Sequence, residues 1–219
     1  MVDVVIPCLN EAPALPGLFA RLPTGYTAIV VDNGSTDGTA EVAHAHGARV
    51  IEVTRPGYGA AVHAGILAAD AEDGVVCVMD GDGSLDPAEL PRLAAPVLSG
   101  SAQMVVGRRR PVDRRAWPSH ARLANRILAR RLRRESGLPI HDIGPMRVVR
   151  RNDLLGLDVR DRRFGYPLEL LIKAGRAGWT VIETDVSYQH RATGTRSKVT
   201  GSFRGTLRAV SDMRAVLAG

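Results

Sequence analysis

Short apolar runs alternate with helical segments along the first half of the chain, and this alternation limits the fold more than any other sequence feature. Four runs rich in Val and Ile are predicted strands, and the three segments between them have helical periodicity. In chain order these elements are Val2–Ile6, Ala12–Leu22, Ala28–Val31, Thr36–His46, Arg49–Val53, Ala60–Ala69 and Val75–Met79. Strands of about five residues separated by helices of about ten predict βαβ units and a largely parallel sheet. The nearly continuous apolar character of the strands is typical of a sheet covered on both faces.

The second half continues this α/β pattern with less regular spacing. Its predicted strands are Met104–Val106, Met146–Val149 and Thr180–Val186, and its predicted helices are Ser119–Glu135, Pro167–Ala177 and Thr206–Leu217. No internal repeat or low-complexity linker divides the sequence, so we expect a single domain over residues 1–219.

The charge of the chain indicates an anionic partner. The net charge is +6, and Lys173 and Lys198 are the only lysines among 29 basic residues. Phosphate, nucleic acid and a lipid headgroup all fit this surplus. Aromatic residues make up only 4% of the chain, which disfavours a nucleic-acid binder that relies on base stacking.

Cysteine usage and the N-terminal sequence bear on the compartment. Cys8 and Cys77 both fall in predicted strands, which favours buried thiols over a disulfide and fits a reducing environment. The chain begins without the features of a signal peptide, and no run approaches the roughly 18 apolar residues of a membrane span. We therefore expect a soluble, cytoplasmic protein, with peripheral contact at the inner membrane face left open.

Polar clusters follow three of the predicted strands, where ligands bind in open parallel sheets. They are residues 7–11, residues 32–39 and residues 80–87. In the third, Asp80 and Asp82 flank a glycine, so both carboxylates can converge on one hard cation such as Mg²⁺ or Mn²⁺. The alternative is a solvated turn. An EF-hand loop is excluded because position 91, where its Glu would stand, is Pro91.

The glycines at 57 and 59 do not make a dinucleotide-binding fingerprint. The third glycine is missing and the segment follows the third strand rather than the first, and the chain has no phosphate-binding Gly-Lys-Ser/Thr. A dehydrogenase or a kinase is therefore disfavoured. Gly57 and Gly59 indicate either a tight turn into a helix or close backbone approach to a ligand.

Together these segments resemble the inverting glycosyltransferases of family 2, which have the GT-A fold and include dolichol-phosphate mannose synthase and bacterial polyprenyl-phosphate glycosyltransferases. The resemblance extends from about residue 3 to about residue 205. The segments that carry it, in order, are residues 6–11, 31–39, 57–61, 79–84, 106–109 and 142–147, Glu169 and residues 194–198.

This resemblance implies a Rossmann-like, mostly parallel sheet flanked by helices. Residues up to about 107 would form the nucleotide-sugar half, about 108–205 the acceptor half, and 206–219 a C-terminal helix. It implies a Mg²⁺ or Mn²⁺ cofactor and a UDP- or GDP-hexose donor. The donor-binding residues would be Pro7, Asn10, Glu11, Asp32, Gly59, Asp80, Arg109, Arg122, Arg191 and Lys198. The catalytic residues would be Asp82, Asp142, Arg147 and Glu169, with Gly194–Lys198 as a loop that closes over the donor.

The sequence departs from the family pattern at several points. Ser84 stands where a Gln ligand often follows the metal pair, so His190 is the candidate third ligand, against the alternative of an ordinary strand-end histidine. Gly144, Pro145, Met146 and Arg147 replace the usual Ser-Gly-Phe-Arg, which affects the acceptor pocket. Many relatives also carry C-terminal membrane helices, and this sequence has none.

The acceptor remains open between two chemistries. A polyprenyl phosphate, which the resemblance favours, is already an anion and needs only positioning by arginines. A small hydroxyl acceptor needs a carboxylate base, for which Asp142 and Glu169 are the candidates, each with a structural role as the alternative. A nucleotidyltransferase is a rival, although Leu9, Asn10 and Glu11 stand where its phosphate loop would begin.

The predicted helix Ser119–Glu135 is basic and amphipathic. Its predicted apolar side consists of Leu123, Ile127, Leu128 and Leu132. Arg122, Arg126, Arg130 and Arg133 recur at near-helical spacing, opposite Leu123, Ile127 and Leu128. The favoured interpretation is a surface helix whose apolar stripe packs into the core. The alternative is a helix that rests on anionic lipid.

Overall fold

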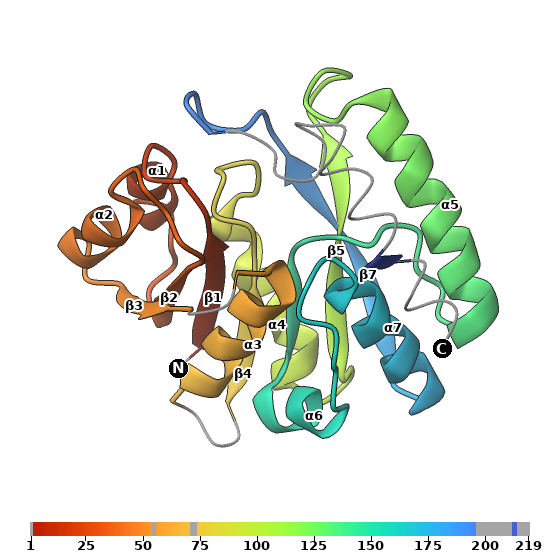
Figure 1. Cartoon of the computed structure of the whole chain (residues 1–219). Coiled ribbons are helices and arrows are strands. Elements are labelled where there is room, and N and C mark those ends of the chain that lie inside the picture. The colour runs from red at the N-terminus through yellow and green to blue at the C-terminus, as the bar shows by residue number, and fades with distance from the viewer. Residues whose placement is uncertain (1, 54–55, 71–73, 196–211, 214–219) are drawn as a thin grey trace.

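The computed structural model describes residues 2–53, 56–70, 74–195 and 212–213. Within these ranges one seven-stranded sheet has helices on both faces (Figure 1). In spatial order its strands are β3 (Arg49–Glu52), β2 (Tyr26–Asp32), β1 (Val2–Cys8), β4 (Val75–Val78), β6 (Arg147–Arg150), β5 (Met104–Pro111) and β7 (Val181–Tyr188). Of the described strands, only β6 runs antiparallel to its neighbours. The predicted α/β fold with a mostly parallel sheet is confirmed.

The helices within the described ranges connect and cover these strands. They are α1 (Leu15–Phe19), α2 (Thr39–Ala45), α3 (Tyr58–Ala68), α4 (Leu90–Leu98), α5 (Ser119–Ser136), α6 (Arg151–Gly156) and α7 (Tyr166–Arg176), with a 3-10 turn, η1 (Pro87–Glu89). None of the helices described has both the length and the apolar character needed to cross a membrane. The helix predicted at Thr206–Leu217, and the part of the predicted loop beyond residue 195, lie outside the described residues apart from 212–213.

Alternate residues of the central strands feed two hydrophobic cores, one on each face of the sheet. Val4 packs in a cluster with Leu93 of α4, whereas its neighbour Val5 packs in a cluster with Ile66 of α3 and Leu171 of α7. Successive strand side chains point to opposite faces, so a strand that is buried on both sides must be apolar throughout. This explains the continuous Val and Ile runs of the sequence.

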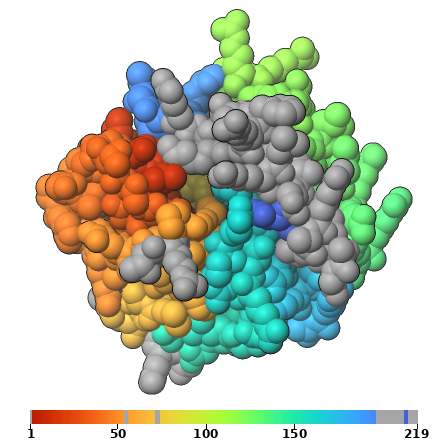
Figure 2. All heavy atoms as spheres, viewed as in Figure 1, coloured from red at the N-terminus to blue at the C-terminus, as the bar shows by residue number. Residues whose placement is uncertain are grey.

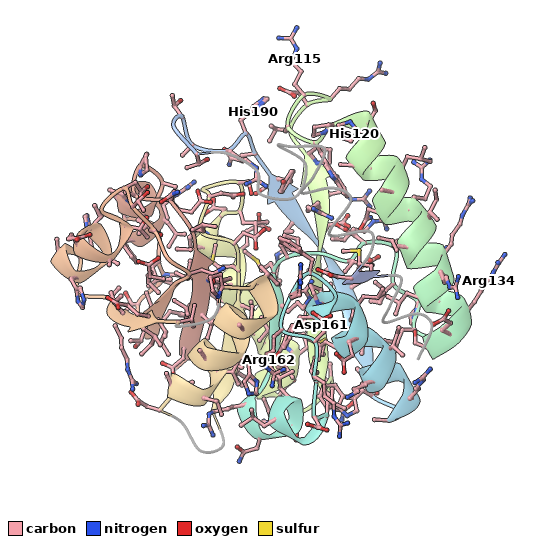
Figure 3. The ribbon with its side chains drawn as sticks, in the orientation of Figure 1. Arg115, His120, Arg134, Asp161, Arg162 and His190 are labelled. Atoms are coloured by element: carbon pink, nitrogen blue, oxygen red, sulfur yellow. The ribbon has the colours of Figure 1, made fainter. Side chains whose placement is uncertain are left out.

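The glycine pair at the start of α3 is required by close chain packing. A Cβ on Gly57 would lie 2.2 Å from the carbonyl oxygen of Arg162, and one on Gly59 would lie 2.7 Å from that of Asp161. The N–H groups of Gly59 and Ala60 donate to the carbonyls of Arg163 and Arg162 at 3.1 and 2.8 Å. Figure 3 places Asp161 and Arg162 beside this helix. At this helix N-terminus, Gly57 and Gly59 therefore allow the close approach of the protein's own backbone at residues 161–163.

Helix α5 is rotated relative to the favoured sequence interpretation. Leu123 and Ile127 are 55% and 57% exposed, and the residues that α5 buries are Ala129 and Leu132. Of the predicted apolar side, Leu132 is buried as expected and Leu128 packs partly against the core. The prediction that Leu123 and Ile127 enter the core was therefore wrong. Arg122, Arg126, Arg130 and Arg133 instead line a cavity between α5 and β5.

Candidate active site

The loops after β1 and β2 meet beyond the carboxyl end of the sheet. Cys8 and Asp32, the last residues of these strands, are paired in register, so the segments that follow them start side by side. The N–H of Asn10 donates to Ser35 Oγ at 2.9 Å, and Asn10 Oδ1 accepts from the N–H of Thr36 at 2.7 Å. Asp32 Oδ1 accepts from the N–H of Ser35 at 2.8 Å. Asn10, at φ 56°, adopts the left-handed conformation that asparagine tolerates. Asn10 thus joins the two loops, and Asp32 shapes the second of them.

Two other predicted donor-site residues lie in the same place. Pro7 is half-buried near the end of β1, and Glu11 is 6% exposed behind it. The N–H of Glu11 donates to Thr39 Oγ1 at 3.0 Å. The structure therefore gathers Pro7, Asn10, Glu11 and Asp32 at one edge of the sheet, as the strand-end argument predicts.

The predicted metal pair follows β4 at this same edge. Asp82 is buried, and its Oδ1 accepts from the N–H and the Oγ of Ser84 at 2.9 and 2.5 Å. Its Oδ2 pairs with Arg191 at 2.5 Å. The chain after β7 also closes on this turn, because the N–H of Ala192 donates to the carbonyl of Asp82 at 2.9 Å. Asp82 is therefore fixed by its neighbours on both sides.

Asp80 is held differently from Asp82. It accepts no hydrogen bond from the residues that the structure describes. Burial, and then the charge of Asp82, raise the pKa of Asp80 to about 6, against the opposing charges of Arg191, Arg147 and Arg109. An acid that is desolvated, crowded by a second carboxylate and short of donors is a suitable ligand for a cation.

Two further basic residues complete the electrostatics of this edge. Arg147, from β6, is 3% exposed, and its Nε has no hydrogen-bond partner among the described residues. Burial raises the pKa of Tyr58 to about 12, the charge of Asp80 adds to the rise, and Arg147 opposes it. Arg147 of β6 and Arg191, which follows β7, thus bring positive charge to Asp80 and Asp82 from segments distant in sequence.

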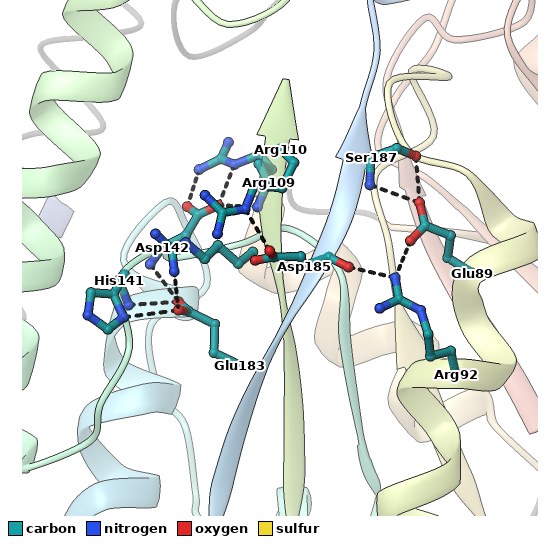
Figure 4. A network of polar contacts seen from close by, with 10 residues as sticks. Glu89, Arg92, Arg109, Arg110, His141, Asp142, Glu183, Asp185 and Ser187 are labelled. Atoms are coloured by element: carbon teal, nitrogen blue, oxygen red, sulfur yellow. Dashed lines mark hydrogen bonds and ion pairs between the residues drawn. The ribbon is translucent and has the colours of Figure 1, made fainter. Parts of the chain in front are cut away.

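The two candidate bases are already engaged. Asp142 is buried and receives Arg109 through three donors, the N–H at 2.8 Å, Nε at 3.0 Å and Nη2 at 2.7 Å. Arg109 also lies over the Trp117 ring, 3.8 Å from its centroid. Figure 4 shows Asp142 and Arg109 within the polar network around β5 and β7. This geometry favours a structural role for Asp142.

Glu169 likewise orients a loop. Its carboxylate accepts from the N–H groups of Arg160 and Asp161 at 2.9 and 2.6 Å and pairs with Lys173 at 2.9 Å. Partial burial acts to raise the pKa of Glu169, but these hydrogen bonds outweigh it and lower the pKa. The segment that Glu169 holds is the one that packs on Gly57 and Gly59, which explains the residue without a catalytic role.

His190 points away from the aspartate pair. Its Nε2 lies 2.8 Å from Asp113 Oδ2, and both side chains are more than half exposed. Figure 3 shows His190 at the same end of the molecule as Arg115 and His120. The described part of the chain contains no group of three His, Cys, Asp or Glu residues placed to hold a metal. His190 would have to turn from Asp113 to reach the site, and Lys198 lies outside the described residues.

A cavity of about 370 Å³ adjoins this edge between α5 and β5. Its lining residues are Arg108, Arg109, Arg110, Pro111, Trp117, Arg122, Asn125, Arg126, Arg130, Arg133, His141 and Asp142. Glu183 and Asp185 of β7 pair with Arg108 at 3.6 Å and with Arg110 at 2.8 Å, and Figure 4 draws the second pair. The cavity is strongly cationic, because seven arginines line it and few carboxylates do.

The sequence analysis identified only part of this arginine cluster. It assigned Arg109 and Arg122 to phosphates but gave Arg126, Arg130 and Arg133 no part in the site. The regular spacing of these three arginines along the helix was the feature that could have indicated their role.

The raised pKa of Asp80 predicts a pH-dependent stability. The unfolded chain releases this proton near pH 4 and the folded chain near pH 6, so the stabilisation from proton binding is lost as pH rises through about 6. With a chelator present, Asp80→Asn should therefore be more stable than the wild type at pH 7.5, by on the order of 2 kcal/mol. The difference should shrink toward pH 5 in thermal denaturation. Asp70→Asn, at a side chain that is 85% exposed, is the matched control, and an Asp80→Asn gain that stays constant between the two pH values would contradict the prediction.

Comparison with known proteins gives a consistent family. Residues 3–156 match the family described as glycosyl transferase family 2. The chain is 54% identical over 217 residues to an uncharacterized glycosyltransferase of Mycobacterium tuberculosis, covering 99% of this chain and 98% of the relative. It is 32% identical over 193 residues to the dolichyl-phosphate hexose transferase of Haloferax volcanii, covering 86% and 83%.

A solved structure extends the similarity to three dimensions. It is glucosyl-3-phosphoglycerate synthase from Mycobacterium tuberculosis in complex with Mn²⁺, uridine diphosphate and glucosyl-3-phosphoglycerate. The TM-score is 0.72 at 26% identity, and the match covers 100% of this chain and 77% of that chain.

Proposed function

The chain belongs to glycosyl transferase family 2, and from that premise we propose that it transfers a hexose from a UDP- or GDP-sugar to a polyprenyl phosphate with inversion, using Mg²⁺ or Mn²⁺. The observation that carries the proposal is the Asp80–Asp82 pair at the carboxyl end of the sheet. Asp80 lacks a donor among the described residues, and its pKa is raised toward neutrality.

The residues present fit a divalent cation. Asp80 and Asp82 would hold it, and a cation there would relieve the repulsion between the two carboxylates. When bound, it supplies positive charge for the departing nucleoside diphosphate. The solved glucosyl-3-phosphoglycerate synthase, which contains Mn²⁺ and uridine diphosphate, supports the same assignment here. His190 is the proposed third ligand, after release from Asp113.

The remaining site residues are assigned from their positions. Pro7, Asn10, Glu11 and Asp32 would surround the base and ribose, with Gly59 close behind them. Arg109, Arg122, Arg191 and Lys198 would bind phosphates of donor or acceptor. Figure 2 shows the N-terminal half, red to yellow, and the later elements, green to blue, on either side of a hollow in this face of the molecule. We assign the donor to the first half and the acceptor to the second.

The engaged carboxylates favour a phosphate acceptor. A hydroxyl acceptor needs a base to take its proton, and both candidates, Asp142 and Glu169, already accept hydrogen bonds from several protein donors. A polyprenyl phosphate attacks as an anion and needs arginines to position it, which the cavity beside β5 supplies. The relative from Haloferax volcanii is named as a dolichyl-phosphate hexose transferase, and dolichyl phosphate is a polyprenyl-type phosphate acceptor.

One observation favours a second candidate function. The solved neighbour is bound to glucosyl-3-phosphoglycerate, which is a small soluble molecule that also carries a phosphate. A small phosphorylated hydroxyl acceptor is therefore the alternative, and the arginines would bind its phosphate. Peripheral contact with the inner membrane face would accompany the first acceptor and not the second.

The test begins with thermal stability in UDP, GDP, CMP and ATP, each with and without Mn²⁺. We expect UDP or GDP to stabilise the protein only when metal is present, by about 3 kcal/mol at a hundredfold excess over Kd. The preferred sugar nucleotide is then offered with polyprenyl phosphate or with 3-phosphoglycerate, and the product is identified by mass. No stabilisation by any diphosphate in the presence of Mn²⁺ would count against the proposal, and transfer to 3-phosphoglycerate alone would select the alternative acceptor.

A further inference from the structure

Helix α5 presents two large apolar side chains to solvent beside arginines that have no ion-pair partner among the described residues. Leu123 and Ile127, one helical turn apart, are 55% and 57% exposed. Arg126, Arg130 and Arg134 are also exposed. At about 100° per residue these five side chains fall within roughly 100° of the helix circumference. We call them the outer face of α5, and Figure 3 shows Arg134 projecting from it away from the body of the protein.

The positive charge of this face is not neutralised within the described chain. Helix α5 contains six arginines and one acidic residue, Glu135, which pairs with Arg131 at 2.7 Å. Arg126, Arg130 and Arg134 form no ion pair or hydrogen bond with any residue that the structure describes. Three of the six arginines of α5 thus lie, without a described partner, on the side where Leu123 and Ile127 are exposed.

We propose that the outer face of α5 docks on the surface of an anionic lipid bilayer. Leu123 and Ile127 enter the boundary between headgroups and acyl chains, while Arg126, Arg130 and Arg134 contact headgroup phosphates. Arg126 and Arg130 also line the cavity beside β5, so the helix lies flat on the membrane with the cavity at its edge. The proposal is independent of the transfer reaction, because it concerns a bilayer that contains neither donor nor acceptor.

Charge and composition favour a lipid surface over other partners. A nucleic-acid backbone would satisfy the arginines but leave Leu123 and Ile127 in water. A second copy docked through the same face would bring like charges together, which is unfavourable. An anionic bilayer satisfies both kinds of side chain, and a short apolar face of this size needs the electrostatic contribution to bind.

The experiment measures binding to phosphatidylcholine vesicles with and without phosphatidylglycerol, free of polyprenyl phosphate. We expect the wild-type protein to bind only the anionic vesicles, with an affinity that falls as salt is raised. The double variant Leu123→Glu/Ile127→Glu should bind at least about tenfold more weakly. Its matched control is Leu67→Glu/Leu98→Glu, at side chains that are 54% and 53% exposed on other helices, and this control should bind as the wild type does.

A second pair of variants separates local charge from net charge. Arg126→Gln/Arg130→Gln should lose at least about tenfold in affinity, whereas Arg160→Gln/Arg176→Gln removes the same charge from exposed positions elsewhere and should lose much less. Circular dichroism checks that each variant is folded. Equal binding by the α5 variants and their controls, or no binding of the wild type to anionic vesicles, would overturn the proposal.

Two other results would also overturn it and would name the occupant. Stabilisation by inorganic diphosphate that depends on Arg126 and Arg130, without vesicle binding, would identify a site for soluble phosphates. A dimer that Leu123→Glu/Ile127→Glu dissociates would identify a second copy. Because the vesicles hold no substrate, none of these outcomes bears on whether the protein binds a nucleotide with Mn²⁺.

Discussion

Replacing Asp82 with alanine should remove the Mn²⁺-dependent stabilisation by UDP or GDP and lower kcat by about a thousandfold or more. A cation at the aspartate pair is worth several kcal/mol of charge stabilisation in the transition state, and each 1.36 kcal/mol corresponds to a factor of ten in rate. Asp82 is the buried member of the pair and is held by Ser84 and Arg191. Its replacement would leave Asp80 as the only member of the pair to bind the ion.

Two variants distinguish loss of the cation from loss of local structure. Asp82→Asn keeps an oxygen that can accept from Ser84 but removes the charge, and it should lose nearly as much activity as the alanine variant. Asp86→Asn is the matched control in the same loop, where Asp86 accepts from the N–H of Ala88 at 3.0 Å and lies 3.8 Å from Arg21. We expect Asp86→Asn to keep its affinity for Mn²⁺.

Direct titration of Mn²⁺ by its electron paramagnetic resonance signal gives a readout besides activity. Weakened binding in both Asp82 variants, with unchanged binding in Asp86→Asn, is the expected pattern. Wild-type affinity for Mn²⁺ in Asp82→Asn would remove the aspartate pair from the metal site. It would also leave the arrangement of Ser84 and Arg191 around Asp82 as a purely structural feature.

The sheet could be predicted from the sequence because its physics is local. Each strand is a short apolar run between turn residues, and all seven strands of the described sheet lie where the pattern places them. The ends are less predictable, since β5 and β7 extend to Pro111 and Tyr188 through polar residues that pair with each other across the strands. That pairing is a property of two segments, and neither segment reveals it alone.

Helix α4 shows what pattern reading overlooked. Its buried residues Leu90, Leu93, Ala94 and Val97 follow helical spacing, but Pro91 and Pro96 lie in the same segment. Proline is compatible with the first turn of a helix, which accounts for Pro91. Pro96 falls only two residues before the last residue of α4. The apolar spacing was therefore the better guide here than the presence of proline.

The sequence predicts the part of the candidate site that follows the ends of parallel strands. It does not predict the part that depends on the spatial order of the strands in the sheet. Residues that follow β1, β2 and β4 meet because parallel strands end at one edge. The family resemblance assigned Arg147 to the site, but its place near the aspartates depends on β6 inserting antiparallel between β4 and β5, which no sequence period encodes. The rotation of α5, which exposes Leu123 and Ile127, was beyond the sequence for a similar reason. The arginines of α5 line a cavity whose other side is formed by β5, and the sequence of α5 alone does not show that this cavity exists.

Asp142→Ala should destabilise the fold strongly, because it leaves the charge of Arg109 without its partner. The two side chains are 15% and 3% exposed, and removing one member of a buried ion pair costs about 3 to 5 kcal/mol. For a chain of this size that corresponds to a fall in melting temperature of roughly 10 °C. Asp185→Ala is the matched control, because Asp185 pairs with Arg110, the neighbour of Arg109 on β5. It breaks the Arg110 ion pair at 2.8 Å, whose side chains are both 53% exposed, and should cost less than about 1 kcal/mol.

The double variant Arg109→Met/Asp142→Leu separates stability from function. It removes both charges, so we expect it to recover much of the lost stability. The rate of glycosyl transfer should stay low, because Arg109 is absent. If Asp142 also acts as a general base, the pH–rate profile of Asp142→Ala should lose the limb that reports ionisation of the base. Loss of that limb would favour a hydroxyl acceptor, because a phosphate acceptor has no proton for Asp142 to remove. The melting temperature therefore tests the structural role of Asp142, and the pH–rate profile decides between the two acceptor chemistries.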